Sequence, residues 1–422
     1  MKKILSVLFC ILIYMLSFSQ EVGEKEQDTI QVKIVEIDEV IIIGNSKKDP
    51  ILTTVNNYFE REVIQPKNVA DLFNNINGFS TIKRGNYAID PTFRAAQYEQ
   101  LNVMYDGVVK AVHACANRMD PITTHVVPEE ISRIEIIKGP YSVRYGPTFG
   151  GIVNMVTKNP DLNERGFHGK LSGGYETKGS SYVTMLQLQQ ITDRYDLVGN
   201  FGYRNFGNYE DGDGFEVPSS FKSTDYGIKA GYNISEAQRI KLHWRQSFGR
   251  DVLHAGLPMD TDYDNSSIVS LNYRISFSEG IVNKMKANFY YSYVDHLMHN
   301  FNRPSFMKME ASSPVESTTL GGKVEMEWDP IKNLSFFTGF DGNHIARDGV
   351  RNRLVKLNMD GDPLPMPMEF TDKIWQDSYI TDIGAFNEIK WYVNNKTFFN
   401  EGIRYYRVSE DIKYPEDDFA EM

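Results

Sequence analysis

The chain has few cysteines, no excess of positive charge and, beyond its first residues, no long apolar run. Its 422 residues include 2 cysteines, so disulfides cannot be its main source of stability. The formal net charge of -11 argues against nucleic-acid binding, which needs clustered cations. Aromatic residues and glycine are abundant instead, with Tyr 24, Phe 25 and Gly 32. Without a predicted spanning helix, this composition favours β structure, including a membrane barrel with aromatic girdles.

Residues 1–19 are predicted to be a cleaved signal peptide. Lys2 and Lys3 precede an apolar run from Ile4 to Phe18, and small residues near Gln20 offer a cleavage point. The run is shorter than the ~20 residues that a membrane-spanning helix needs. Cys10 lies within this run rather than after it, which disfavours lipid attachment. Cys115 is then the only cysteine of the mature, exported chain, and a lone thiol needs another explanation than a disulfide.

Residues 20–49 are expected to be a flexible N-terminal segment, and residues 50–160 a compact block with both helix and strand patterns. Within the flexible segment, the apolar half of Glu36–Gly44 has a strong preference for β structure. It is either a first core strand or an extended segment that adds to the sheet edge of a partner. In the block, Val69, Leu72, Phe73 and Ile76 share one face of a predicted helix over residues 68–77. Strands are predicted at residues 79–83, 101–105, 130–138 and 152–157.

From Gly166 onward the sequence alternates with a period of two residues. We expect about eleven strands, near the ~9–11 residues each that a tilted membrane strand needs. The predicted turns alternate between short and long, as they do at the two rims of a transmembrane barrel. A soluble sandwich is the alternative, although it would show less asymmetry. The long loops are expected at residues 207–224, 248–265, 298–317 and 347–377.

Four metal ligands lie in two short clusters, Cys115 with Met119 and His296 with Met298. Thiolate, thioether and imidazole together favour a soft ion such as Cu(I). A tight loop or helical turn would bring the first pair to one ion, and residues 296 and 298 share a face on a strand. Two thioethers would be poor ligands for zinc. Because the thiolate forms on binding, copper affinity should fall at low pH.

Other residues near these clusters either contribute to metal binding or have ordinary structural roles. His113 and His299 flank the two motifs as candidate auxiliary ligands, while His125 is expected on the surface. The methionines of the presumed outer loops either relay copper inward or simply pack; they are Met307, Met309, Met359, Met366 and Met368. A single cysteine is most often a small buried hydrophobe. The coincidence of both motifs is what favours a metal.

Several motifs together resemble the TonB-dependent outer-membrane receptors. Residues 131–140, 145–146 and 150–158 resemble the signature that closes the plug domain of that family, and residues 71–78 and 102–107 resemble earlier plug motifs. The resemblance implies a TonB box, the strand offered to the TonB energy-coupling protein, at Ile37, Asp38, Glu39, Val40, Ile41, Ile42 and Ile43. It also implies a Gram-negative outer-membrane location in contact with lipid, no catalytic residues and no cofactor.

Within that family, Cys-x-x-x-Met in the plug and His-x-Met in the wall resemble the copper-importing receptors. The fold class implied is an α+β plug domain, residues 50–160, inside a transmembrane antiparallel β-barrel that begins at residue 161. The chain supplies about 11 of the 22 strands of such a barrel. We therefore expect a truncated product or, less favoured, a partner chain that completes the barrel, because open sheet edges are costly in lipid.

Three other functions remain open at this point. The same architecture can import a siderophore, haem or glycan ligand. Cys115 with His113 or His125 can be a thiol nucleophile and base in a secreted hydrolase, although no oxyanion or substrate-pocket motif accompanies them. The chain can also be a non-functional remnant.

Overall fold

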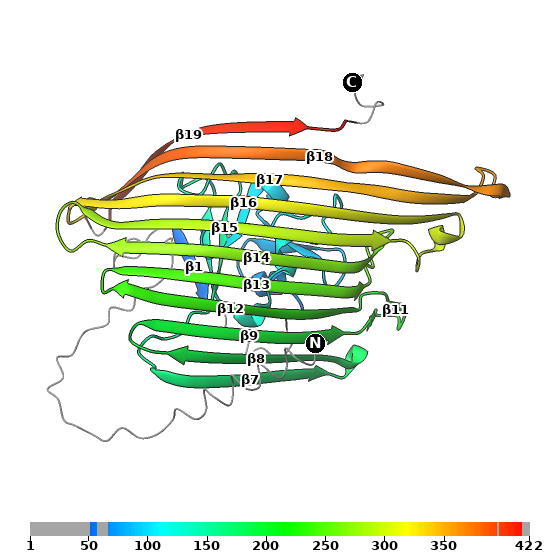
Figure 1. Ribbon diagram of the computed structural model, residues 1–422, viewed down its shortest axis with the longest axis horizontal. Coiled ribbons are helices and arrows are strands. Elements are labelled where there is room, and N and C mark those ends of the chain that lie inside the picture. Colours follow the sequence, from blue (N-terminus) through cyan, green and yellow to red (C-terminus); the bar gives the residue numbers. More distant parts are fainter. Residues whose placement is uncertain (1–50, 57–65, 395, 416–422) are drawn as a thin grey trace. The chain divides into compact units, whose positions relative to one another are not determined.

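The computed structural model describes residues 51–56, 66–394 and 396–415. The predicted signal peptide and the predicted TonB box lie outside these residues. The described part consists of a block of short strands that ends at Thr157 and a large antiparallel sheet that follows it (Figure 1). No helix among the described residues is long and apolar enough to cross a membrane.

The first block, which we call the plug, is built on a four-stranded sheet in the order β1-β5-β6-β4. Its strands are β1 (Leu52–Asn56), β4 (Leu101–Tyr105), β5 (Ile131–Lys138) and β6 (Gly151–Thr157). Every residue of β6 is buried, as expected of a central strand that is covered on both faces. A hairpin of β2 (Phe79–Lys83) and β3 (Ile89–Phe93) completes the strands of the plug.

Short 3-10 helices connect these strands, namely η2 (Val69–Phe73), η3 (Tyr98–Gln100), η4 (Ile122–Thr124) and η5 (Pro128–Glu130). The helix predicted over residues 68–77 is thus a 3-10 helix that ends at Phe73. Its start is as expected, because the Asn68 side chain accepts a hydrogen bond from the backbone N–H of Ala70. Val69, Phe73 and Ile76 still lie in the plug core, so the predicted apolar face is correct although the helix is shorter.

Eleven strands form the large sheet, which confirms the number expected from the alternation. In sheet order they are β7 (Gly166–Glu176), β8 (Ser181–Ile191), β9 (Tyr195–Phe206), β12 (Phe221–Ser235), β13 (Gln238–Val252), β14 (Asp260–Ser276), β15 (Val282–His299), β16 (Met309–Ile331), β17 (Leu334–Leu357), β18 (Pro363–Tyr392) and β19 (Phe398–Ile412). The remaining elements are η6 (Lys178–Ser180), the small hairpin β10 (Tyr209–Glu210) and β11 (Glu216–Val217), and η7 (Pro304–Met307). Among the described residues, β7 and β19 each have one strand neighbour, so the sheet has two edges (Figure 1).

Most of the predicted long loops are wrong in extent. The strands continue through much of them, and the connections that remain are residues 253–259, 300–308 and 358–362. Backbone pairing persists beyond the alternating sequence: Met309 pairs with Val355 on β17, and Val355 pairs with Met368 on β18. Backbone hydrogen bonds do not require alternating side chains, so sequence periodicity underestimates the length of these strands.

The two faces of the sheet have opposite polarity. On β13, the inward positions are buried polar residues, among them His243, Arg245 and Ser247. The opposite face exposes large apolar side chains across the whole sheet, for example Phe201, Leu242 and Phe340. This inversion of the usual soluble pattern is typical of a β-barrel wall that faces lipid on its outside.

Ion pairs hold the plug against the inward face. Arg144, in the loop after β5, lies 2.5 Å from Glu325 of β16, and both side chains are almost fully buried. Glu388 of β18 accepts hydrogen bonds from the Ser142 hydroxyl (2.7 Å) and the Val143 backbone N–H (2.9 Å). Arg245 of β13 lies 2.8 Å from Glu130 of the plug. These contacts fix the plug loops relative to particular strands.

We predict that Glu325→Gln weakens plug docking. The change removes the carboxylate partner of Arg144 in a buried site, and breaking a buried pair typically costs about 3–5 kcal/mol. Thermal unfolding in detergent and protease cleavage of the plug measure the effect. The control is Asp251→Asn, which breaks an exposed pair with Lys222 and should cost less than about 1 kcal/mol. Equal stability of both variants would contradict the prediction.

Candidate metal centre

The plug presents Cys115 and Met119 on a tight loop between β4 and η4. The backbone N–H of Arg118 donates to the carbonyl of Cys115 (2.9 Å), and Arg118 has a left-handed backbone with φ 54. Both carboxylate oxygens of Asp120 accept backbone hydrogen bonds from the same loop, from Ala114 (2.6 Å) and Cys115 (3.0 Å). The Asp120 side chain therefore closes the loop on itself. Cys115 and Met119 are both fully buried.

Two wall strands hold the start of this loop. The indole Nε1 of Trp375, on β18, donates to the carbonyl of Ala114 (2.5 Å). Nε of Arg347, on β17, donates to the carbonyl of His113 (3.0 Å). The thiol position is thus set by contacts with strands more than 200 residues away in sequence.

The wall contributes His296 and Met298 from the end of β15. Alternation along the strand places both on the inward face, where both are buried. His296 lies opposite Asp264 and Met298 lies opposite Thr261 on β14. The register shifts between Thr261 and Tyr263, and such a bulge changes which residues face inward. Its effect is to turn the Thr261 hydroxyl toward the two ligand candidates.

All four predicted ligands meet where this loop contacts β15. The Cys115 thiol lies 3.5 Å from the Met298 sulfur. The Thr261 hydroxyl lies 3.4 Å from Nε2 of His296 and 3.8 Å from the Met119 sulfur. Cys115, Met119 and Met298 also belong to one buried cluster. Three sulfurs and an imidazole from two parts of the fold therefore border one small volume.

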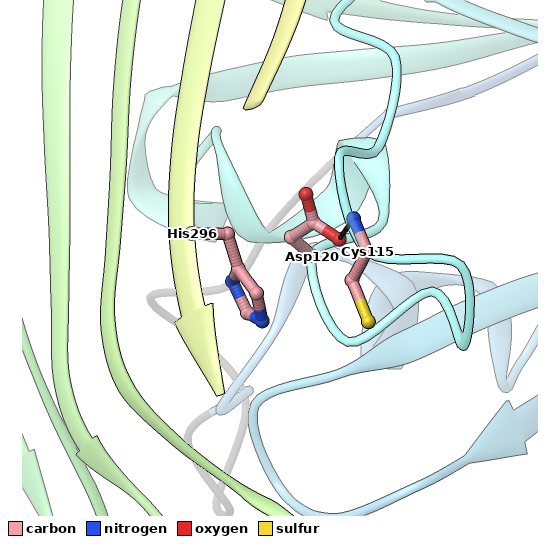
Figure 2. Close-up of side chains that lie close together, drawn as sticks. All are labelled: Cys115, Asp120 and His296. Atoms are coloured by element: carbon pink, nitrogen blue, oxygen red, sulfur yellow. Dashed lines mark hydrogen bonds between the residues drawn. The ribbon is translucent and has the colours of Figure 1, made fainter. Parts of the chain in front are cut away.

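A carboxylate completes the surroundings of this volume. Ligand atoms of Cys115, Asp120 and His296 all lie within 4.8 Å of one another. Figure 2 shows the thiol and the imidazole directed to the same side, with Asp120 between their backbones and bonded to the Cys115 N–H. Burial raises the pKa of Asp120 to about 7, and Asp264 adds to the increase, while His296 and the two N–H donors oppose it. Negative charge on Asp120 is thus costly without a nearby cation.

Donor chemistry in this volume fits a soft cation. Thiolate, thioether and imidazole suit Cu(I), and zinc binds thioethers poorly. The nearby imidazole of His254 belongs to the loop before β14, and its Nε2 lies 3.0 Å from the Thr261 hydroxyl. The pKa of His254 is lowered to about 3, mainly by burial and also by the neighbouring charges of His296 and Arg303. His254 is therefore neutral and adds no positive charge that would repel a metal ion.

Of the four predicted auxiliary residues, one packs against the buried cluster and three make their contacts elsewhere. Nδ1 of His113 lies 3.1 Å from the Arg118 guanidinium; burial and the charges of Arg118 and Arg347 lower the pKa of His113 to about 2. His299 stacks on Phe301, with ring centroids 4.3 Å apart, and points away from the inward face of β15. Met307 is exposed, whereas Met309 packs at the edge of the buried cluster.

The surface position expected for His125 is wrong. Its side chain is 1% exposed, because η4 packs into the plug and against β14. Three further methionines are exposed, as expected of loop positions, namely Met359, Met366 and Met368. Two of them, Met366 and Met368, nevertheless belong to β18 rather than to a loop.

Sequence reasoning missed Thr261, Asp264 and His254. Asp264 reaches His296 only through the pairing of β14 with β15, and Thr261 faces inward only because of the bulge. Neither feature has a local sequence signal. His254 lies within the predicted loop 248–265, and nothing in that segment points to a metal.

Comparison with known proteins agrees with this architecture. Residues 50–152 match the family model "TonB-dependent Receptor Plug Domain". The haem transporter BhuA of Brucella ovis is 26% identical over 266 residues, which span 58% of this chain and 38% of BhuA. The vitamin B12 transporter BtuB of Vibrio vulnificus is 23% identical over 219 residues, 50% of this chain and 33% of BtuB. The chain thus spans well under half the length of these relatives.

Among solved structures, the copper transporter OprC superposes with a TM-score of 0.72 at 24% identity, covering 86% of this chain and 56% of OprC. The FrpB iron transporter from Neisseria meningitidis superposes with a TM-score of 0.64 at 15% identity, covering 86% of this chain and 59% of FrpB. Residues 50–152 are thus identified as a TonB-dependent receptor plug domain, and the described chain shares its fold with these transporters. The relatives and structures named here are all described as transporters, so they give the thiol hydrolase alternative no support.

We predict a specific pH dependence for the stability of this protein without metal. The pKa of Asp120 is higher in the folded state than its ordinary value of 3.8, so the folded state binds more protons and loses stability as pH rises from about 4 to about 7. Asp120→Asn cannot ionise, so the melting temperature of this variant relative to wild type should rise across that interval and then level off.

Thermal unfolding in detergent, without metal, measures this difference at each pH. The matched control is Asp161→Asn, because Asp161 also accepts a local backbone hydrogen bond but lies in an exposed turn. The control should show no such trend. A difference between Asp120→Asn and wild type that stays constant with pH would contradict the account of Asp120.

Proposed function

We propose that this receptor binds copper as Cu(I) and imports it across the outer membrane with energy supplied by TonB. The observation that carries the proposal is the contact of the plug thiol of Cys115 with the wall thioether of Met298, 3.5 Å apart in a buried site beside His296. Thiolate, thioether and imidazole are the donors that suit Cu(I). The similarity to a protein named as a copper transporter supports the same cargo.

The division of the ligands gives release a physical cause. Cys115 and Met119 belong to the plug, whereas His296 and Met298 belong to β15. Pulling on the predicted TonB box, Ile37 to Ile43, would displace the plug and separate the two halves. Half of the donor set holds a cation poorly, because each half supplies two donors rather than four. Copper would then leave toward the periplasm.

Methionines supply a route toward the site in this proposal. Met309 packs against the buried cluster at its edge, and Met307 is exposed nearby at the end of η7. Met366 and Met368 are exposed on β18. Thioethers exchange Cu(I) readily without carrying charge, so these side chains would collect copper before it reaches Cys115.

A second candidate cargo is an organic ligand such as haem or a metal chelate. It is favoured by a cavity of about 620 Å³ beside the metal centre, lined by Tyr98, Lys110, His113, Arg118 and Arg347 among others. That volume is typical of small-molecule sites. Relatives named as haem and vitamin B12 transporters point the same way. Binding of haem to the receptor without copper, unaffected by changes at Cys115, would favour this candidate.

We predict that Cys115→Ala and His296→Ala each abolish stoichiometric copper binding. Loss of one strong donor should weaken Cu(I) affinity by at least about 100-fold, or about 2.8 kcal/mol. Metal analysis of the purified receptor after Cu(I) loading measures the bound copper. His299→Ala is the control, since His299 follows Met298 directly but points away from the inward face of β15. Copper that stays bound in Cys115→Ala would remove the proposal.

We also predict that the site selects soft ions. Ag(I) should displace Cu(I) at comparable concentration, whereas Zn(II) in excess should not, because two of the donors are thioethers. Competition during loading, followed by elemental analysis, tests the order. Displacement of copper by zinc would show that the thioethers do not bind the metal.

A further inference from the structure

His296 is the last of three residues that lie in a row across neighbouring strands of the sheet. Gly249 on β13 lies opposite Asp264 on β14, and Asp264 lies opposite His296 on β15. Directly opposed side chains on one face of a sheet are close neighbours. Asp264 is therefore held beside His296 by strand register alone.

Asp264 meets the ring nitrogen that faces away from Thr261. Its Oδ1 lies 3.4 Å from Nδ1 of His296, and both residues are fully buried. Neither atom has a hydrogen-bond partner elsewhere among the described residues. A carboxylate at Nδ1 keeps the proton on that nitrogen and leaves the Nε2 lone pair available to a metal. Nε2 is the nitrogen that lies 3.4 Å from the Thr261 hydroxyl, which is itself 3.8 Å from the Met119 sulfur.

A plug side chain holds the other oxygen of this carboxylate. The Tyr87 hydroxyl donates to Oδ2 of Asp264 at 2.8 Å, and the Thr124 hydroxyl lies 3.4 Å from the same oxygen. Tyr87 is 4% exposed, and its ring packs against Phe221 of β12 with centroids 5.3 Å apart. The plug thus touches the wall ligand His296 indirectly, through Asp264.

Gly249 makes room for this contact. A Cβ at Gly249 would lie 2.5 Å from the Tyr87 hydroxyl oxygen and 3.3 Å from Cβ of Asp264. The backbone of Gly249 has no positive φ, so the glycine is required for space and not for conformation. A Cβ added to Gly199 on β9, by contrast, would lie in open space.

We propose that Tyr87, Asp264 and Gly249 are positioning residues of the copper site. Tyr87 orients the Asp264 carboxylate, which in turn fixes the ring and the protonation of His296. The inference rests on the proposed function. It adds a second consequence of plug movement: withdrawal of Tyr87 frees Asp264, so the wall half of the site loses its organisation at the moment when the plug half leaves.

The test uses Tyr87→Phe, Asp264→Asn and Gly249→Ala in the full receptor. Tyr87→Phe keeps the ring packing, and Gly249→Ala acts on Tyr87 without changing any ligand or carboxylate. Cu(I) affinity is measured by competition with a chromophoric Cu(I) chelator, and X-ray absorption of bound copper reports its sulfur and nitrogen neighbours. Melting temperatures without metal report folding.

Each variant should bind Cu(I) about 10–100-fold more weakly than wild type, the usual effect of removing an outer-shell partner. The nitrogen contribution to the absorption spectrum should decrease while the sulfur contribution remains. Two controls should match wild type. Tyr293→Phe removes a tyrosine–carboxylate bond, to Glu316, on the outer face of β15, and Gly199→Ala adds a methyl group to the sheet in open space.

The outcomes separate this inference from the proposed function. Wild-type affinity in Tyr87→Phe and Gly249→Ala, with copper lost in His296→Ala, would overturn the inference and leave the function intact. Parallel loss of sulfur and nitrogen neighbours with a lower melting temperature would show a purely structural role and also overturn it. Absence of copper from the wild type would overturn both.

Discussion

The thiol of Cys115 and the thioether of Met298 lie 3.5 Å apart although 183 residues separate them in sequence. Two independent constraints produce this contact. The loop that carries Cys115 is closed by Asp120 and held by Trp375 and Arg347 of the wall. Met298 is set by the register of β15 between its neighbours. A soft cation between them would join two parts of the fold that otherwise meet through ion pairs and packing.

Buried polar contacts between the plug and the inward face explain why the junction is well defined. The inward face of the wall is polar, so plug side chains find charged partners there, such as Glu325, Glu388 and Arg245. Pairs of this kind are costly to separate when buried. The candidate metal centre differs from them, because its donors are mostly neutral and soft and gain little from one another without a cation.

Local sequence pattern predicts the parts of this structure that depend on local geometry. The alternation of His296 and Met298 places both on one face, and the short spacing of Cys115 and Met119 brings them into one loop. The number of wall strands also follows from alternation. Strand length, the bulge beside Thr261 and the pairing of Asp264 with His296 depend on partners elsewhere in the chain, so no local pattern reveals them. The buried position of His125 likewise depends on how η4 packs.

The central claim is that one soft cation occupies the volume between the plug loop and β15. Anomalous diffraction from crystals of the receptor loaded with Cu(I), collected at the copper edge, tests it most directly. The account predicts a single strong peak bounded by the Cys115, Met119 and Met298 sulfurs and Nε2 of His296. A peak elsewhere in the molecule, or no peak at full loading, would contradict it.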